Sequence, residues 1–510
     1  MTIPPPVAGP LPADGKPVGD HRVAAPTTAG TLAEHAAALQ RHGFRLALVA
    51  AHDDGDTLRA VYLFTAANPD RRIELHLPID RDRPTVPSLA GLSFPAGRFE
   101  REMHDLYGIR PVGHPLPRRL VRHGHWPSGW YPMRHDAGPA PDFTHDDGPF
   151  PFLSVEGPGV YEIPVGPVHA GLIEPGHFRF SVVGESILKL KARLWYVHKG
   201  IEKLFQDRAV AAGLPLAERI SGDTAVGHGL AYCRAVEDAL RIQVPDQAQR
   251  MRAILLEMER LYNHVGDIGA LCNDVGHGVL NAHALRIKEV LLRLNKETTG
   301  HRLLRGGILP GGAVLRRVPD PDRLASIGAD IREVIALALG NSLVAERFTG
   351  TAVLATAPAR DLGALGYVAR ASGIDIDARR DHPADSLTGP YSVPTQSGGD
   401  VMARFHQRAA EIDASLALLD TLVRSVSPAT ITGQPAPDAT ASGVGIVEGW
   451  RGTIVHRIET TPGPRLARVK VVDPSFFNWP ALPVALAGTI VGDFPLVNKS
   501  FNLSYAGNDL

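Results

Sequence analysis

The sequence contains only two cysteines, Cys233 and Cys272, in 510 residues. Two cysteines exclude a disulfide framework and favour a reducing compartment. They also exclude a zinc site built on paired Cys-x-x-Cys motifs. A thiolate-ligated iron–sulfur cluster normally needs four cysteines, so we expect electrons to reach this chain from a partner.

An excess of charge of one sign and long apolar runs are also lacking. The chain has 53 basic and 54 acidic side chains and a formal net charge of −1, which gives no electrostatic basis for binding nucleic acid or an anionic membrane. Residues 1–30 show no signal-peptide pattern. The longest apolar candidate, residues 482–491, is about half of the roughly 20 residues that a membrane-spanning helix needs. We therefore expect no direct membrane span and no nucleic-acid partner.

The N-terminal part of the sequence predicts a small α+β domain that follows a disordered tail. Residues 1–30 are rich in proline, glycine and alanine, a composition typical of disorder. A candidate helix and a small antiparallel sheet follow, since three runs alternate between apolar and polar residues. These runs are 44–49, 58–64 and 72–77. We expect the domain to cover residues 31–120, and residues 121–159 to form a linker or docking segment.

The sequence from residue 160 to 510 predicts a large, mostly α-helical bundle domain with small β additions. Apolar residues repeat at helical spacing in four segments, which is enough for the core of a helical bundle. These segments are 249–271, 284–296, 320–338 and 400–419. A half-buried strand is expected at 188–194, and two short strands are expected within 443–472.

Two parts of the chain are similar to known families. The segments 99–109 and 113–120 resemble the signature of the C-type subunit of complex I. From about residue 160 onward, the chain resembles the large subunit shared by NiFe-hydrogenases and complex I, where it is the D-type subunit. The matching segments are 198–203, 218–237, 257–264, 305–308, 371–375, 447–452, 473–476 and 493–496. The fusion of the C-like and D-like parts resembles the large subunit of membrane-bound, energy-converting hydrogenases of group 4, as in formate hydrogenlyase.

The resemblance implies a metal site whose ligands are missing. The hydrogenases hold a nickel–iron centre with the thiolates of Cys-Gly-x-Cys-x-x-x-His and a C-terminal Cys-x-x-Cys, because soft sulfur ligands suit it. The corresponding positions here are Ser221, Thr224, Ser504 and Gly507. A hydroxyl group is a poor nickel ligand and glycine offers no side-chain ligand. We therefore predict no nickel–iron centre, no other metal and no hydrogenase activity.

The resemblance to complex I implies quinone as the other candidate ligand. Complex I holds the quinone headgroup with a tyrosine and a histidine. The tyrosine position falls on Gly222, and the histidine corresponds to His177 or His169. The quinone site is therefore incomplete as well, and quinone is the one cofactor that stays a candidate for this chain.

Titratable side chains remain near the former ligand positions. Glu202 matches the glutamate that relays protons in the hydrogenases, and Asp223 and His228 belong to the first ligand motif. Buried carboxylates and imidazoles are costly unless they are paired, which makes these three residues a candidate proton relay. In the alternative, Asp223 pairs with Arg219 or Lys199 and only holds the former site together.

These features predict the large subunit of a membrane-associated, hydrogenase-related, complex I-like oxidoreductase complex that couples electron transfer to ion translocation. The alternatives are a quinone-binding subunit of an NADH dehydrogenase-like complex and a non-catalytic assembly scaffold. The resemblance implies an iron–sulfur small subunit and antiporter-like membrane subunits as partners. Through them the chain would lie in the cytoplasm, on the inner face of the cytoplasmic membrane. No glycine-rich dinucleotide fingerprint is visible, so NAD is expected on another subunit.

Overall fold

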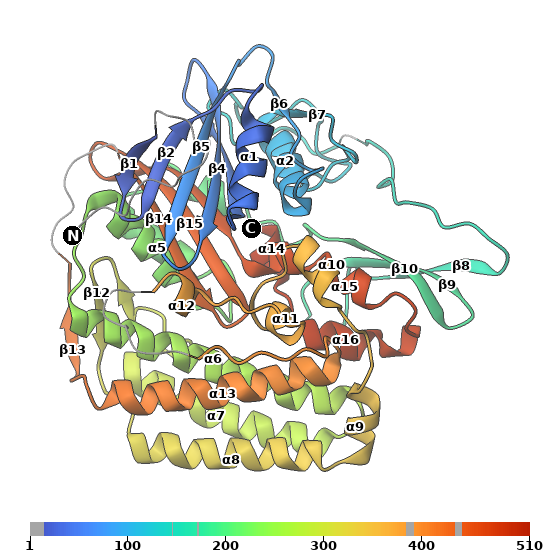
Figure 1. The fold of residues 1–510 in the computed structure, drawn as a ribbon, viewed down its shortest axis with the longest axis vertical. Coiled ribbons are helices and arrows are strands. Elements are labelled where there is room, and N and C mark those ends of the chain that lie inside the picture. Colours follow the sequence, from blue (N-terminus) through green and yellow to red (C-terminus); the bar gives the residue numbers. More distant parts are fainter. Residues whose placement is uncertain (1–14, 145, 171–172, 384–391, 434–440) are drawn as a thin grey trace. The chain divides into compact units, whose positions relative to one another are not determined.

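The computed structural model describes residues 15–510 except 145, 171–172, 384–391 and 434–440 (Figure 1). The chain divides into two compact units, Met1–Phe152 and Leu153–Leu510, which we call the N-terminal and the C-terminal unit. The finer division predicted above, with a linker at 121–159, stays a prediction. Among the described residues, no helix is both long enough and apolar enough to cross a membrane.

The N-terminal unit is built on a five-stranded sheet with the strand order β1-β2-β5-β4-β3. Its strands are β1 Lys16–Gly19, β2 Arg22–Pro26, β3 Arg45–Asp53, β4 Leu58–Ala66 and β5 Arg71–Ile79. The unit also contains helices α1 Leu32–Arg41 and α2 Phe94–Tyr107 and the short parallel pair β6 Thr85–Pro87 and β7 Arg110–Val112. The three predicted strands are confirmed as β3, β4 and β5, which pair antiparallel.

The disordered tail predicted over residues 1–30 is corrected for residues 16–26. These residues form β1 and β2, and β2 pairs in parallel with β5. Arg22 on β2 is buried, and its Nη1 lies 3.0 Å from Oε1 of Glu74 on β5. This buried ion pair ties β2 to the sheet, and a composition rich in proline and glycine does not reveal such a contact. Residues 1–14 lie outside the described part of the chain.

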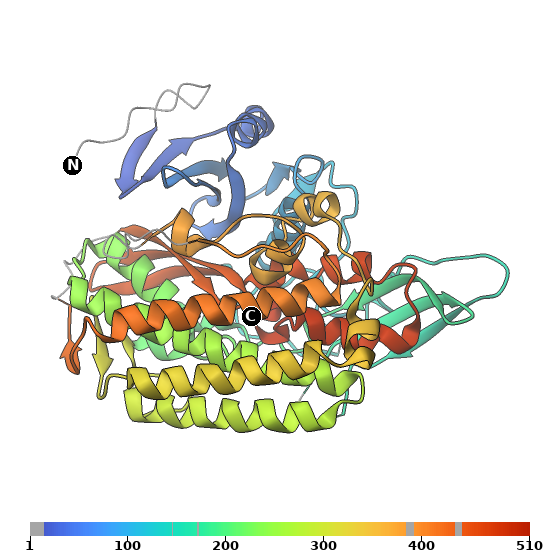
Figure 2. The ribbon, with the colours of Figure 1, turned by 60° about the horizontal axis from the view of Figure 1, so that its bottom comes forward.

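Five long helices form the framework of the C-terminal unit. They are α5 Ala225–Leu240, α6 Asp246–Asp274, α7 Gly278–Thr299, α8 Pro321–Leu339 and α13 Val401–Val423. Helices α6, α7, α8 and α13 run side by side (Figures 1 and 2), and the four helical segments predicted from the sequence lie in them. The Asp320 side chain caps α8 by accepting hydrogen bonds from the backbone N–H groups of Asp322 and Arg323, as N-cap residues do.

A three-stranded antiparallel sheet lies under α5. Its strands are β14 Ser442–Gly449, β15 Gly452–Thr461 and β16 Arg465–Val472, where the sequence predicted two strands. Gly445 on β14 allows the close approach of α5, because a Cβ there would lie 2.0 Å from the carbonyl oxygen of Ala231. This close backbone contact packs one face of α5 against β15. It therefore sets how much space the side chains between the helix and the sheet have.

Short elements complete the C-terminal unit. The remaining strands are β8 Val160–Val165, β9 His177–Val183, β10 Ser186–Arg193, β11 Ile308–Leu309, β12 Gly312–Leu315 and β13 Ala429–Ile431. The remaining helices are α3 Ile201–Phe205, α4 Val210–Ala217, α9 Ser342–Phe348, α10 Thr356–Asp361, α11 Gly366–Ala371, α12 Ala378–Asp381, α14 Pro474–Asn478, α15 Ala481–Ala485, η1 Val491–Asp493, α16 Phe494–Phe501 and α17 Tyr505–Asp509. Strand β10 confirms the predicted strand near residue 190.

Candidate functional site

The two short motifs predicted to belong together meet in the structure. Oγ of Ser221, just before α5, lies 2.8 Å from Oγ of Ser504, although 283 residues separate them. Ser504 is the N-cap of α17 and accepts a hydrogen bond from the backbone N–H of Gly507 at 2.8 Å. Both serines are buried. We call Ser221, Asp223, Thr224, Ser504, Gly507 and Arg451 the candidate site.

The strongest polar contact of the candidate site is a bidentate ion pair between Arg451 and Asp223. Nη1 and Nη2 of Arg451 each lie 2.7 Å from one carboxylate oxygen of Asp223. Ser221 and Thr224 donate their hydroxyl groups to Oδ1 of Asp223 at 2.9 and 3.0 Å. The Arg451 guanidinium stacks on the Trp450 ring, 3.9 Å from its centre, as arginine commonly does on aromatic faces.

The ion pair keeps Asp223 charged although the surrounding protein partly desolvates it. Burial raises the pKa of Asp223, but the charge and hydrogen bonds of Arg451 outweigh burial and lower it to about 2. The Asp223 side chain is 38% exposed, whereas that of Arg451 is only 4% exposed. The candidate site therefore presents an ionised carboxylate to solvent and keeps the arginine behind it.

The predicted partners of Asp223 were wrong. Arg219 donates instead to a backbone carbonyl 2.6 Å away, and Lys199 donates to the backbone carbonyl of Ile220 at 2.9 Å. Arg451 was missed because it follows Asp223 by more than 200 residues in the sequence. The sequence did contain one indication of its importance, because Arg451 lies in the segment 447–452, which resembles the family.

The fourth ligand position has no room for a side chain. A Cβ added to Gly507 would lie 2.6 Å from both Cγ and Oδ2 of Asp473, closer than real Cβ atoms approach. Thr224 accepts a hydrogen bond from Nε1 of Trp450 at 3.1 Å, and Ser221 is engaged by Ser504 and Asp223. This set of hydroxyl groups and one glycine does not fit a thiolate-held nickel–iron centre.

The two cysteines do not supply the missing thiolates. Cys233 and Cys272 are both buried and lie on α5 and α6, away from the four ligand positions in the sequence. Burial raises the pKa of Cys272 to about 12, and it also raises the pKa of Cys233. Both thiols are therefore protonated, whereas a metal ligand must be a thiolate.

His228 is part of a buried polar chain that the sequence did not reveal. Its Nε2 lies 2.9 Å from Oδ2 of Asp473, and its Nδ1 lies 3.1 Å from Nε2 of His456. All three side chains are buried. Burial raises the pKa of Asp473, but its contacts with His228 and the charge of Arg451 lower it on balance. In the sequence, Asp473 stands out only because it lies in the segment 473–476, which resembles the family, and nothing singles out His456.

Glu202, the first member of the predicted relay, has its own set of partners on β16. Nη2 of Arg468 lies 2.7 Å from Oε2, and Nζ of Lys470 lies 3.1 Å from Oε1. The backbone N–H of Val471 donates to Oε1 at 2.9 Å. Burial raises the pKa of Glu202, but these two cations lower it on balance. None of these partners belongs to the candidate site.

The predicted quinone-binding positions lie in two segments. Nε2 of His169 lies 2.8 Å from the carbonyl oxygen of Gly176, and Nδ1 of His177 lies 3.1 Å from that of Gly166. Both histidines therefore hydrogen-bond the backbone of the same loop region. A Cβ added to Gly222 would meet open space, so a side chain fits there. Quinone binding by these residues stays a prediction.

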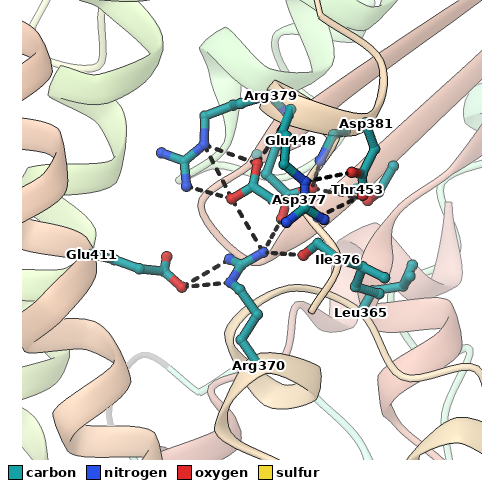
Figure 3. Close-up of polar contacts among 12 residues, drawn as sticks. Leu365, Arg370, Ile376, Asp377, Arg379, Asp381, Glu411, Glu448 and Thr453 are labelled. Carbon is teal, nitrogen blue, oxygen red and sulfur yellow. Dashed lines mark hydrogen bonds and ion pairs between the residues drawn. The ribbon is translucent and has the colours of Figure 1, made fainter. Parts of the chain in front are cut away.

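A buried charge cluster includes Glu448, which lies two residues before Trp450 in the sequence (Figure 3). Arg370 on α11 lies between Glu411 on α13, 2.9 Å away, and Glu448 at the end of β14, 2.7 Å away. Arg260 on α6 donates to the backbone carbonyl of Glu448 at 2.8 Å. Because this carbonyl is two residues before Trp450, the cluster fixes the direction in which the turn presents Arg451.

Comparison with known proteins places the chain among subunits of two kinds. Residues 24–142 match the family "Respiratory-chain NADH dehydrogenase, 30 Kd subunit", and residues 274–439 match "Respiratory-chain NADH dehydrogenase, 49 Kd subunit". Residues 199–268 match "Nickel-dependent hydrogenase". The first and second of these matches correspond to the two parts whose fusion the sequence indicated.

Several curated proteins are similar over most of their length. Formate hydrogenlyase subunit 5 of Escherichia coli is 33% identical over 86% of this chain and 79% of its own. Hydrogenase-4 component G of the same organism is 34% identical over 84% of this chain and 77% of its own length. The C/D subunit of NADH-quinone oxidoreductase of Phocaeicola vulgatus is 29% identical over 68% of this chain and 71% of its own length.

A solved structure shares the fold. It is a chain of the membrane-bound sulfane sulfur reductase, described as an archaeal respiratory membrane complex, with a TM-score of 0.63. The match covers 69% of this chain and 99% of that chain at 23% sequence identity. At this identity the match supports the fold alone.

Proposed function

Since this chain belongs to the family that unites hydrogenase large subunits of the formate hydrogenlyase type with the C/D subunits of NADH-quinone oxidoreductase, we propose that it is the large subunit of a membrane-associated oxidoreductase complex without a nickel–iron centre. The complex couples electron transfer to ion translocation. An iron–sulfur small subunit and antiporter-like membrane subunits hold it on the inner face of the cytoplasmic membrane. The relatives named above carry this part of the proposal.

One observation carries the loss of the metal. The hydroxyl groups of Ser221 and Ser504 contact each other, and the Ser221 hydroxyl also donates to Asp223. The Asp473 carboxylate fills the space that a side chain at Gly507 would need. A nickel–iron centre needs soft thiolates at these positions. Because hard oxygen donors have taken both the positions and the space, the proposed function contains no step at a metal in this chain.

The geometry also suggests how the candidate site contributes. A carboxyl group with a pKa of about 2 is almost always ionised at neutral pH and is a weak base, whereas efficient proton transfer needs a pKa near the working pH. We therefore infer that Asp223 fixes Arg451 and sets the charge of the site. Protons would be carried by His228, which lies between the Asp473 carboxylate and the His456 imidazole.

Elemental analysis of the complex tests the absence of nickel. The chain is purified with its partners from its own membranes, and nickel and iron are measured per large subunit. We expect iron, from an iron–sulfur small subunit, and far less than one nickel per chain. About one nickel per chain would overturn the proposal, and so would purification of the chain alone under conditions that keep membrane complexes intact.

Quinone binding is the second candidate function, favoured by the open space next to Gly222. A headgroup could lie where the complex I relatives place a tyrosine side chain. A photoreactive quinone analogue should then label residues near Gly222, and Gly222→Trp should abolish the labelling by filling the space. Labelling that is unchanged in Gly222→Trp would exclude this position. If neither nickel nor quinone is found, the assembly-scaffold alternative gains support.

A further inference from the structure

The space beside Gly507 is filled by a carboxylate that is held from two sides. Oδ1 of Asp473 accepts a hydrogen bond from the backbone N–H of Ser475 at 2.7 Å, which caps α14. Oδ2 lies 2.9 Å from Nε2 of His228. With both oxygens engaged, the carboxylate cannot rotate away from Gly507 without losing a contact. The φ angle of Gly507 is not in the left-handed region, so space rather than backbone conformation requires a glycine there.

The hydrogen-bond directions in the chain of Asp473, His228 and His456 follow from the charge of Asp473. An ionised carboxylate only accepts, so Nε2 of His228 carries a hydrogen and donates it. In neutral His228, Nδ1 is then an acceptor, and Nε2 of His456 donates to it. The remaining nitrogen, Nδ1 of His456, carries no hydrogen in this state and has no hydrogen-bond partner among the described residues.

We propose that Asp473 occupies the space of the fourth ligand side chain and that Asp473, His228 and His456 form a buried proton-holding chain beside the candidate site. This inference rests on the proposed function in one respect, the absence of a metal ligand at residue 507. It assigns to Asp473 and His456 a role that the resemblance to hydrogenases and complex I does not supply.

The proposed step balances as the uptake of one proton. A proton adds to Nδ1 of His456, the N–H bond at Nε2 of His456 breaks, and that hydrogen forms a new bond with Nδ1 of His228. His456 ends neutral with its hydrogen on Nδ1. His228 becomes an imidazolium that donates to the Asp473 carboxylate on one side and to His456 on the other. The reverse sequence releases the proton.

The surroundings favour this division of roles. Burial and the charge of His228 lower the pKa of His456 well below its usual value, so His456 passes a proton on rather than keeping it. His228 has the fixed negative charge of Asp473 next to it, which stabilises an imidazolium. The charge of Arg451 acts on both Asp473 and Asp223. A proton held on His228 therefore changes the field at the candidate site.

A double-mutant cycle tests the replacement of the fourth ligand. Gly507→Ala should increase the unfolding equilibrium constant of the purified full chain about tenfold or more, because overpacking forces rigid neighbours apart. In an Asp473→Ser background the same change should cost about threefold or less, because contacting sites couple. Gly222→Ala is the matched control, since a Cβ there meets open space. If Gly507→Ala is tolerated as well as Gly222→Ala, the replacement is refuted.

Infrared spectroscopy with a pH jump tests the proton chain. The full chain is labelled with ¹³C-histidine and followed between about pH 8 and pH 5, the range in which histidine titrates. The imidazolium signal that His228→Gln removes should also be lost in Asp473→Asn. His456→Leu should slow its appearance about tenfold or more, and so should His456→Asn, which keeps a polar group but cannot pass a proton through.

His264→Leu is the control for this experiment. His264 is also buried, lies 3.0 Å from the carboxylate of Glu411, and has an Nδ1 without a hydrogen-bond partner in the described part of the chain. It contacts no second histidine through a hydrogen bond there, so its loss should leave the rate unchanged. An unchanged rate in both His456 variants, or an unchanged spectrum in Asp473→Asn, would refute the proton chain. Neither result bears on the nickel content, so the two proposals fail independently.

Discussion

Arg451 makes the largest contribution to the low pKa of Asp223, because an opposite charge in direct contact favours the ionised carboxylate. Both guanidinium prongs contact Asp223, and the guanidinium also donates from Nε to the backbone carbonyl of Asn502 at 2.6 Å. Stacking on Trp450 leaves the group little freedom. Lysine could not reproduce this fork, since its ammonium group is a point charge.

Replacing this arginine should change how stability depends on pH. The folded-state pKa of Asp223 is depressed to about 2, so its stabilising contribution is present above the unfolded-state value of about 3.9 and is lost as pH falls toward 2. In Arg451→Met this contribution disappears. The free energy of unfolding should therefore be lower than that of wild type at pH 7, and the difference should narrow below about pH 4.

Urea titrations of both proteins at several pH values measure this difference. The effect should be modest because the Asp223 side chain is partly exposed and solvent screens the pair. Arg219→Met is the control, because the Arg219 guanidinium donates to a backbone carbonyl and not to Asp223. A gap between wild type and Arg451→Met that is constant with pH would contradict the ion pair.

The residues of the candidate site were predictable only in part. Ser221, Thr224, Ser504 and Gly507 were found because family motifs mark short stretches of sequence, and the structure brings these stretches together. The sequence assigned no role to Arg451 in the site or to Asp473 and His456 beside it, because each meets its partner across more than 200 residues. Pairing over such distances depends on the packing of α5 on its sheet, which no local pattern encodes.

At the scale of elements, the contact between α5 and β14 positions His228 over His456. Helical periodicity predicted the four long helices α6, α7, α8 and α13, because their apolar faces repeat over several turns, but it did not predict α5. The sequence did not reveal the short strands β1 and β2, because β2 is held in the sheet by pairing with β5, a strand farther along the chain. It also gave no sign that α5 would press directly on the backbone of β14, where glycine replaces a side chain.

Filling this contact should separate the two elements. In Gly445→Ala the new Cβ would lie 2.0 Å from the carbonyl oxygen of Ala231 and 2.7 Å from the backbone nitrogen of Ala235. Backbone atoms cannot give way as a flexible side chain does. We expect the free energy of unfolding to fall by about 2–3 kcal/mol or more, as measured by chemical denaturation. In Gly492→Ala, where the nearest atom is 3.9 Å away, it should change by less than about 0.5 kcal/mol.

At the scale of the C-terminal unit, one buried network joins helices and strands that are distant in the sequence. Arg370 contacts Glu411 and Glu448 (Figure 3). Arg379 contacts Glu257 at 3.1 Å. The network thus ties α6, α11, α12, α13 and β14 together beneath the turn that carries Arg451. Buried ion pairs often add little net stability, because desolvation offsets their attraction. Their value here is to hold one arrangement of these elements.

Removing the central cation should therefore cost far more than the pair contributes. Arg370→Met leaves Glu411 and Glu448 buried without their main counter-charge, and breaking a buried pair in this way costs about 3–5 kcal/mol. Burial raises the pKa of Glu411, but the charge of Arg370 and the hydrogen bond from His264 lower it well below its usual value on balance. The stability that the ionised Glu411 provides is therefore present above the unfolded-state pKa of about 4.3 and is lost as pH falls. The deficit of Arg370→Met should thus be largest near neutral pH and smaller in acid.

Chemical denaturation of the full chain at several pH values measures this deficit. Arg286→Met is the control, since the exposed Arg286–Asp330 pair should contribute at most about 1 kcal/mol. Equal losses in the two variants would show that the network does not organise the unit, and the turn that presents Arg451 would then have to be fixed by other contacts.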